Sequence, residues 1–235
     1  MRLEALIDNI EKNHRIVSIV GAGGKSTLME TLARKLTGYG HRVLNTTTTH
    51  IWQPADGTYA ASLEEAEQLW NRGYYAVAGV PDQKCRLTAL REEDMRCYMK
   101  AADIIFIEAD GARRMPCKLP AAHEPVILEE SSLVIGVMGM DCLGQRIKDC
   151  CFRWQEGAAW LDAEGGERMT PELAARILSS EQGTRKNCGG RAYAVVLNKC
   201  DTAELLMQAE DIKNKLEKYG IKEVVKTSLK RGTDT

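Results

Sequence analysis

A short stretch near the amino terminus places glycines directly before a lysine and two hydroxyl side chains. Residues 21–27 read GAGGKST and lie between an apolar run at 15–20 and a helical pattern that begins at residue 25. Glycine backbone adopts positive φ and brings N–H groups close to phosphate oxygens, while a helix N-terminus adds partial positive charge. A lysine here reaches the β- and γ-phosphates of a nucleotide, and the next hydroxyl ligates Mg²⁺. We therefore predict a phosphate-binding loop formed by Gly21, Ala22, Gly23, Gly24, Lys25, Ser26 and Thr27.

The spacing of this loop departs from the usual GxxxxGK[ST] pattern, because Ile19 stands two positions before Gly21. What remains is GxxGKS, which resembles the nucleotide loop of the Mur-type ligases. The alternative interpretation is a tight strand-to-helix connection with a solvated lysine. We expect Lys25 to be an exposed loop residue that contributes little to the core.

Two carboxylates follow a second apolar run, in the stretch DIIFIEADGARR at 103–114. Glu108 and Asp110 stand at the expected carboxyl end of a strand, where ligands bind in a parallel α/β sheet. A carboxylate there holds Mg²⁺ directly or through water, and Gly111 is placed to offer its N–H to the γ-phosphate. The candidates for catalysis are Lys25, Glu108 and Asp110, and those for the metal are Ser26, Glu108 and Asp110. The alternative is that both carboxylates only cap a turn.

Two later segments match motifs that recognise a nucleotide base. The strand-like AVVLNKCD ends in Asn198, Lys199 and Asp201, which form the NKxD pattern by which GTPases read guanine. The stretch VVKTSLKRG resembles the fifth GTPase motif and places Ser228 at the base pocket. The pattern around Glu108 and Gly111 in turn resembles the third motif of the GTPases that mature hydrogenase and urease. The sequence thus favours Mg²⁺ with GTP over Mg²⁺ with ATP.

Other candidates carry weaker signals. The stretch NTTTTHI at 45–51 ends a strand in hydroxyls that either contact phosphate or only favour the strand, and we expect His50 to be packed in the core. None of the eight cysteines forms a CxxC pair, so free thiols are expected. The adjacent Cys150 and Cys151 either carry a chalcogen or a soft metal ion, or, as we favour, are buried structural thiols.

Apolar, β-branched runs alternate with amphipathic stretches along the chain. Strands are predicted at 15–20, 41–48, 74–79, 103–109, 132–140, 191–199 and 222–228, and helices at 25–40, 62–73, 91–102, 170–183 and 202–220. This alternation indicates an α/β fold with a three-layer, mostly parallel sheet, like that of P-loop NTPases. We expect one such domain over residues 1–235, with a lid or small subdomain at about 139–190.

Composition narrows the class of protein further. The chain has 235 residues, a net charge of −1, 28% charged and 44% hydrophobic residues, which gives no surface suited to nucleic acid. No apolar run approaches 18 residues, and the first residues do not show the basic start followed by an apolar core that is typical of a secretory signal. We therefore expect a cytoplasmic protein without a membrane partner.

Together, VGAGGKSTLM, TTTTHI, EADGARRMPCKLPAAHEPVI, TPELAARIL and VLNKCD resemble the YqeC family. The resemblance spans most of the chain, and the block from 108 to 127 is its most specific part. It implies an accessory protein of selenium-dependent molybdenum hydroxylases, with phosphate and magnesium held by Gly21, Gly24, Lys25 and Ser26. Glu108 and Asp110 are implied for the metal or water, and Asn198 with Asp201 for the base. Cys117 and His123 lie in the family-like block without an assigned role.

The leading interpretation is a nucleotide-hydrolysing maturation factor whose chemistry is positioning and charge stabilisation. The alternatives are a cofactor-binding chaperone that does not hydrolyse nucleotide and a small Mur-like ligase or kinase. Expected partners are the nucleotide and a molybdenum hydroxylase or the proteins that make its cofactor. A homodimer is left open.

Overall fold

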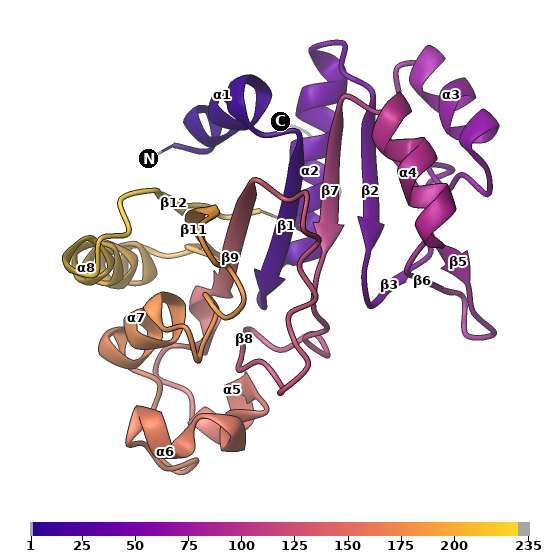
Figure 1. The fold of residues 1–235 in the computed structure, drawn as a ribbon. Helices are drawn as coiled ribbons and strands as arrows, with labels where there is room; N and C mark the ends of the chain where they lie inside the picture. The colour runs from indigo at the N-terminus through magenta and orange to yellow at the C-terminus, as the bar shows by residue number, and fades with distance from the viewer. Residues whose placement is uncertain (1, 230–235) are drawn as a thin grey trace.

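The computed structural model describes residues 2–229, and a parallel seven-stranded sheet runs through its centre (Figure 1). The strand order is β12-β11-β9-β1-β7-β2-β4, and every pairing between neighbours is parallel. The strands are β1 (Ile16–Gly21), β2 (Val43–Thr47), β4 (Ala76–Val77), β7 (Ile104–Glu108), β9 (Leu133–Gly139), β11 (Ala192–Asn198) and β12 (Val224–Lys226).

Helices cover both faces of this sheet. The helices α1 (Leu3–Asn13) and α2 (Lys25–Gly38) pack on one face, in a buried cluster with alternate residues of β1, β7 and β9. On the other face, α3 (Leu63–Asn71) and α4 (Glu92–Ala101) cover β2 and β7, and α7 (Pro171–Ser179) and α8 (Ala203–Lys218) cover β9 and β11. Strands buried on two faces are apolar at nearly every position, which is why their sequences read as continuous apolar runs.

Local signals set the starts of the helices. Ser62, Thr170 and Thr202 each accept a hydrogen bond from the backbone N–H three residues later, which caps α3, α7 and α8. Pro171 occupies the first turn of α7, where its missing N–H costs no hydrogen bond. The helix α2 instead begins at Gly24, whose side chain offers no cap.

Two small sheets flank the carboxyl ends of the central strands. β3 (His50–Trp52), β6 (Arg86–Thr88) and β5 (Val80–Pro81) form an antiparallel sheet, and β8 (Cys117–Lys118) pairs in parallel with β10 (Cys151–Phe152). Residues 139–190 also hold short helical turns beside α7. These turns are η1 (Met140–Cys142), α5 (Ile147–Cys150), η2 (Trp154–Glu156) and α6 (Ala158–Leu161).

The predicted fold class is confirmed. All seven predicted strands and all five predicted helices are present, and they form a three-layer α/β sheet with a glycine-rich loop between β1 and α2. The small sheets and α1 were not predicted. All eight cysteines are free thiols, as expected. Among residues 2–229, no helix has both the length and the apolar character needed to cross a membrane.

Candidate functional site

The loop between β1 and α2 has a backbone that only glycine fits. Gly24 has φ +127°, and a Cβ on it would lie 2.2 Å from Nδ2 of Asn198. Gly23 has φ +83°, and its Cβ would lie 2.0 Å from the backbone nitrogen of Gly139. Neighbouring strands hold the loop in place, since the N–H of Ala22 donates to Val137 O at 2.9 Å. Close backbone contacts and hydrogen bonds to neighbouring segments therefore fix the shape of the loop.

Lys25 is not the exposed residue that we expected. Its side chain is 4% exposed, and its Nζ lies 2.6 Å from Gly21 O, 2.9 Å from Asp110 Oδ1 and 3.7 Å from Glu108 Oε1. Burial alone lowers the pKa of Lys25, but the attraction of Asp110 and Glu108 outweighs burial and raises it. The ammonium group is therefore charged and held beneath the loop.

Ser26, at the start of α2, lies in contact with Glu108, at the end of β7. The Ser26 hydroxyl donates to Glu108 Oε2 at 3.0 Å. Burial raises the pKa of Glu108, and Lys25 and Ser26 oppose that rise. Mg²⁺ characteristically takes one or two protein oxygens together with phosphate oxygens and water, which is the number that this pair offers. Within residues 2–229, no three His, Cys, Asp or Glu side chains gather as a metal-binding cluster.

Asp110 has a different position from Glu108. Its side chain is 3% exposed, and its Oδ2 accepts a hydrogen bond from Gly21 N at 3.0 Å. The same oxygen lies 3.1 Å from Nζ of Lys118. Glu108 faces the large cavity described below, whereas Asp110 does not line it. Asp110 thus holds the loop backbone and its lysine in place.

The ion pairs continue from Asp110 toward residues 139–190. Nζ of Lys118 lies 2.7 Å from Glu124 Oε2, and Glu124 is also paired with Arg153. The side chains of Lys118 and Glu124 are 1% and 7% exposed, so the interior of the molecule contains a row of alternating charges. Sequence reasoning missed both residues, although they lie in the block from 108 to 127 that carries the family resemblance.

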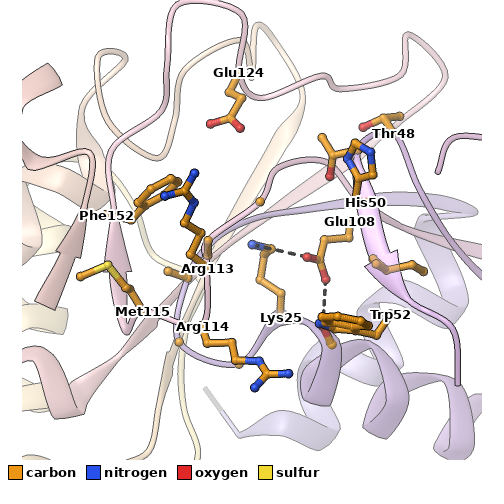
Figure 2. Close-up of a pocket in the computed structure, with 18 of the residues that line it drawn as sticks. Lys25, Thr48, His50, Trp52, Glu108, Arg113, Arg114, Met115, Glu124 and Phe152 are labelled. Carbon is orange, nitrogen blue, oxygen red and sulfur yellow. Dashed lines mark hydrogen bonds and ion pairs between the residues drawn. The ribbon is translucent and has the colours of Figure 1, made fainter. Parts of the chain in front are cut away.

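A cavity of about 1050 Å³ opens above the loop (Figure 2). Its floor contains residues 22–27 of the loop with Glu108, and Gly111 lies in its wall. Figure 2 shows Lys25 and Glu108 joined near the centre, with Arg113 and Phe152 on one side and His50 and Trp52 on the other. Three separate parts of the chain therefore enclose the loop: the segment after β7, the β3-β6-β5 sheet and the turn around β10.

The proposed base-binding residues lie beside the loop. Nδ2 of Asn198 donates to Gly23 O at 3.0 Å, and its Oδ1 accepts from Thr227 Oγ1 and Leu229 N, each at 3.0 Å. Asn198 thus ties the loop to the ends of β11 and β12.

The other members of this set are more accessible. Asp201 is exposed and accepts a hydrogen bond from Ser228, so these two side chains lie together. Lys199 lines the cavity and pairs with Asp141 at 2.6 Å. The structure brings all four candidates to the same edge of the sheet as the loop.

The threonines before β3 are used mainly by the fold. Thr47 donates to Glu108 O and Thr48 to Val126 O, both at 2.8 Å. Thr48 and Thr49 also line the cavity. The expectation that His50 is packed in the core is wrong, because β3 belongs to an edge sheet and His50 is exposed on the cavity wall.

The adjacent cysteines are buried in the apolar cluster beneath α7. Cys150 and Cys151 are 0% and 1% exposed, and Cys151 pairs in register with Cys117. Burial raises the pKa of Cys150 to about 12, and a thiol that stays protonated is a weak nucleophile and metal ligand. The geometry favours buried structural thiols.

Strand order and loop define the class: a three-layer α/β protein with a P-loop-like turn between its central strand and α2. The family model described as YqeC protein matches residues 17–155, which is more than half of the chain. The chain therefore belongs to the YqeC family. It is also 32% identical over 183 residues to the uncharacterized protein YqeC of Escherichia coli (strain K12).

That match covers 71% of this chain and 66% of the Escherichia coli protein, so the chain spans just under two thirds of that relative. Among solved structures, the crystal structure of HypB from Helicobacter pylori in complex with nickel aligns with a TM-score of 0.43 and 10% identity. The alignment covers 96% of this chain and 84% of that one. The assigned fold class rests on the strand order and the loop.

Proposed function

We propose that this protein binds a nucleoside triphosphate with Mg²⁺ at residues 21–27 and hydrolyses it as an accessory factor for another enzyme. The observation that carries the proposal is the glycine-only loop, with the Ser26–Glu108 pair beside it on the floor of a cavity. Backbone N–H groups at the start of α2 suit phosphate oxygens, and the serine and glutamate oxygens suit magnesium. Fold class alone does not assign this function, so it rests on the site.

Each candidate side chain has a role in this proposal. Lys25 exchanges its contacts with Glu108 and Asp110 for the β- and γ-phosphates, which keeps a buried positive charge compensated throughout. Ser26 and Glu108 hold the metal, which would stabilise the charge that develops on the phosphates. Asp110 positions the loop through Gly21, and Gly111 offers its N–H from the opposite side.

Guanine is the proposed base. Asn198 fixes the loop, while Asp201 and Ser228 lie together at the exposed edge beyond it. A carboxylate at this position accepts hydrogen bonds from N1–H and the 2-amino group of guanine, whereas adenine offers an acceptor at N1 and has no 2-amino group. Losing two hydrogen bonds to a charged group, each worth about 1.5 to 3 kcal/mol, lowers affinity by roughly 10² or more.

The client enzyme is proposed from the family alone. Membership in the YqeC family supports a role in maturing a selenium-dependent molybdenum hydroxylase or its cofactor. In this proposal residues 139–190 act as a lid, since Phe152 and Arg153 form part of the cavity wall. Turnover is then slow for the protein alone and faster when the client closes the site.

Thermal stabilisation by a panel of nucleotides tests the binding site, because a ligand that binds the folded state raises its apparent stability. We expect GTP and GDP to stabilise the protein with Mg²⁺ and ATP to do so at about 10²-fold higher concentration. Asp201→Asn should weaken GTP binding and improve xanthosine triphosphate binding, and Asp8→Asn, at an exposed position of α1, is the matched control. Equal stabilisation by ATP and GTP, unchanged by Asp201→Asn, contradicts the guanine assignment.

Single-turnover measurements with the triphosphate test hydrolysis. We expect product to form slowly with the protein alone and faster with the partner hydroxylase. Triphosphate that stays intact in both cases identifies a protein that binds nucleotide without hydrolysing it. A phosphorylated or ligated product identifies a kinase or ligase instead.

A further inference from the structure

Among the residues that the structure describes, two arginines in the cavity wall have no acidic partner. Arg113 and Arg114 follow β7, line the cavity and are exposed. Within residues 2–229, neither forms an ion pair or a hydrogen bond to a carboxylate. The other lysines and arginines that line the cavity are each paired with an acidic side chain: Lys25, Arg86, Arg153 and Lys199.

Aromatic rings hold both guanidinium groups in place. The guanidinium carbon of Arg113 lies 5.0 Å from the ring centre of Phe152, and that of Arg114 lies 5.8 Å from Trp52. A guanidinium stacked on a ring keeps its in-plane N–H groups free for the two oxygens of an anion. Figure 2 shows the two side chains diverging toward these rings on opposite sides of the cavity.

The backbone that presents the arginines is also unusual. Arg113 has φ +47° and Arg114 has φ +62°, so two consecutive residues with side chains adopt the left-handed region. Such conformations cost about 1–3 kcal/mol each and are concentrated at binding sites. Here these backbone conformations direct the two long basic side chains toward the same cavity.

The arginines lie away from the proposed base site. The cavity reaches Lys199 but is not lined by Asn198, Asp201 or Ser228. Its volume of about 1050 Å³ lies just above the usual range for small-molecule pockets, about 300–1,000 Å³. There is consequently space on the phosphate side of the loop for a second molecule.

We propose that Arg113 and Arg114, with Trp52 and Phe152, bind a second, phosphorylated small molecule beside the terminal phosphate of the nucleotide. This proposal rests on the nucleotide site proposed above, and it adds a second ligand next to that site. Two unpaired arginines supply two positive charges, and a phosphate monoester carries about −1.5 to −2 at neutral pH. The planar guanidinium fork matches phosphate oxygens in pairs, and the exposed ring of Trp52 offers apolar contact to the rest of the molecule.

Phenyl phosphate is a suitable probe, because it joins one phosphate monoester to one ring. The protein is first saturated with Mg²⁺ and a non-hydrolysable GTP analogue, and phenyl phosphate is then titrated in a calorimeter. We expect saturable binding that weakens at least about 10-fold in Arg113→Ala/Arg114→Ala. The same double variant should bind the GTP analogue with unchanged affinity. Arg96→Ala, on the exposed face of α4, is the control and should change neither affinity.

Three results would overturn the proposal. Phenyl phosphate that fails to bind saturably, or binds the double variant as tightly as the original protein, removes the site. Phenyl phosphate that competes with the analogue, together with weaker analogue binding by the double variant, assigns the arginines to the nucleotide itself. If the protein binds no nucleotide, the function proposed above is contradicted. The arginine site is then decided separately, by whether phenyl phosphate titrated without nucleotide binds more weakly to the double variant than to the original protein.

Discussion

Charged side chains are compensated differently on two walls of the cavity, the loop wall and the arginine wall. At the loop, Lys25, Glu108 and Asp110 are nearly inaccessible to solvent and satisfy one another. Across the cavity, Arg113 and Arg114 are exposed and stacked only on rings. Buried charges must be paired inside the protein. Exposed charges are instead solvated by water, and they can exchange that water for contacts with a ligand at little cost in free energy.

This difference separates two kinds of functional residue. The side chains of the loop wall are buried and paired with one another, so they contribute to stability as well as to the binding proposed for them. The arginine wall is expected to contribute to the proposed binding alone. Four substitutions test the distinction.

Lys25→Ala should have the largest effect on stability. It leaves the carboxylates of Glu108 and Asp110 buried without their cation, and breaking such a pair costs about 3–5 kcal/mol. Urea unfolding measures the change, and Lys35→Ala, on the exposed side of the same helix, is the control. Adding Asp110→Asn to Lys25→Ala should restore part of the loss. A loss below about 1 kcal/mol would place Lys25 in solvent.

Gly24→Ala should follow, at about 3 kcal/mol, because a Cβ adds backbone strain and displaces Asn198 from Gly23 O. Gly40→Ala is the matched control, since Gly40 also has positive φ (+94°) but nothing lies within 4 Å of its Cβ position. That variant should lose only about 1 kcal/mol. Equal losses in the two variants would mean that the contact with Asn198 does not matter.

Glu108 should make metal-dependent binding sensitive to pH. Burial raises the pKa of Glu108 above its ordinary value of 4.5, so its contribution to stability is greatest below pH 4.5 and is lost as pH rises through the folded value. Mg²⁺ needs the ionised form, so the Mg²⁺-dependent part of GTP binding should weaken on acidification from a pH above 4.5.

Calorimetry at several pH values measures this dependence. Glu108→Gln should lower Mg²⁺-dependent affinity about 10-fold and remove its change with pH. A pH profile identical in Glu108→Gln and the original protein would assign the titration to another group.

The smallest effect is expected on the arginine wall. Arg114→Ala should change the free energy of unfolding by less than about 0.5 kcal/mol, because only an exposed ring contact is lost. Arg153→Ala, at the Phe152 side of the cavity, should cost about 1–2 kcal/mol because it removes a partner of the buried Glu124. Thermal unfolding compares the two, and the reverse order would erase the distinction between the walls.

Sequence patterns predicted the elements that are long or buried on two faces. Continuous apolar runs identified all seven central strands, and strand-to-helix punctuation located residues 21–27. The short edge strands β3 and β5 lie outside any continuous apolar run, unlike the equally short β4 and β12 of the central sheet. For that reason the edge sheet was missed, and with it the exposed position of His50.

The burial of Lys25 depends on contacts that no local pattern contains. Its environment is completed by Asp110 and Lys118, which arrive from a segment more than eighty residues away in the chain. The left-handed backbone of Arg113 and Arg114 likewise has no glycine to signal it. Residue types indicated the chemistry, and only tertiary packing determined which charges were paired.

The position of β1 in the sheet has a consequence for biosynthesis. This strand is made first but lies between β7 and β9, and the loop that follows it is held by Val137 of β9 and by Asn198 at the end of β11. Such pairings over long sequence separations form late. A ribosome must therefore have released most of the chain before the loop acquires its shape, so a nascent or truncated polypeptide lacks the formed loop that is proposed to bind phosphate.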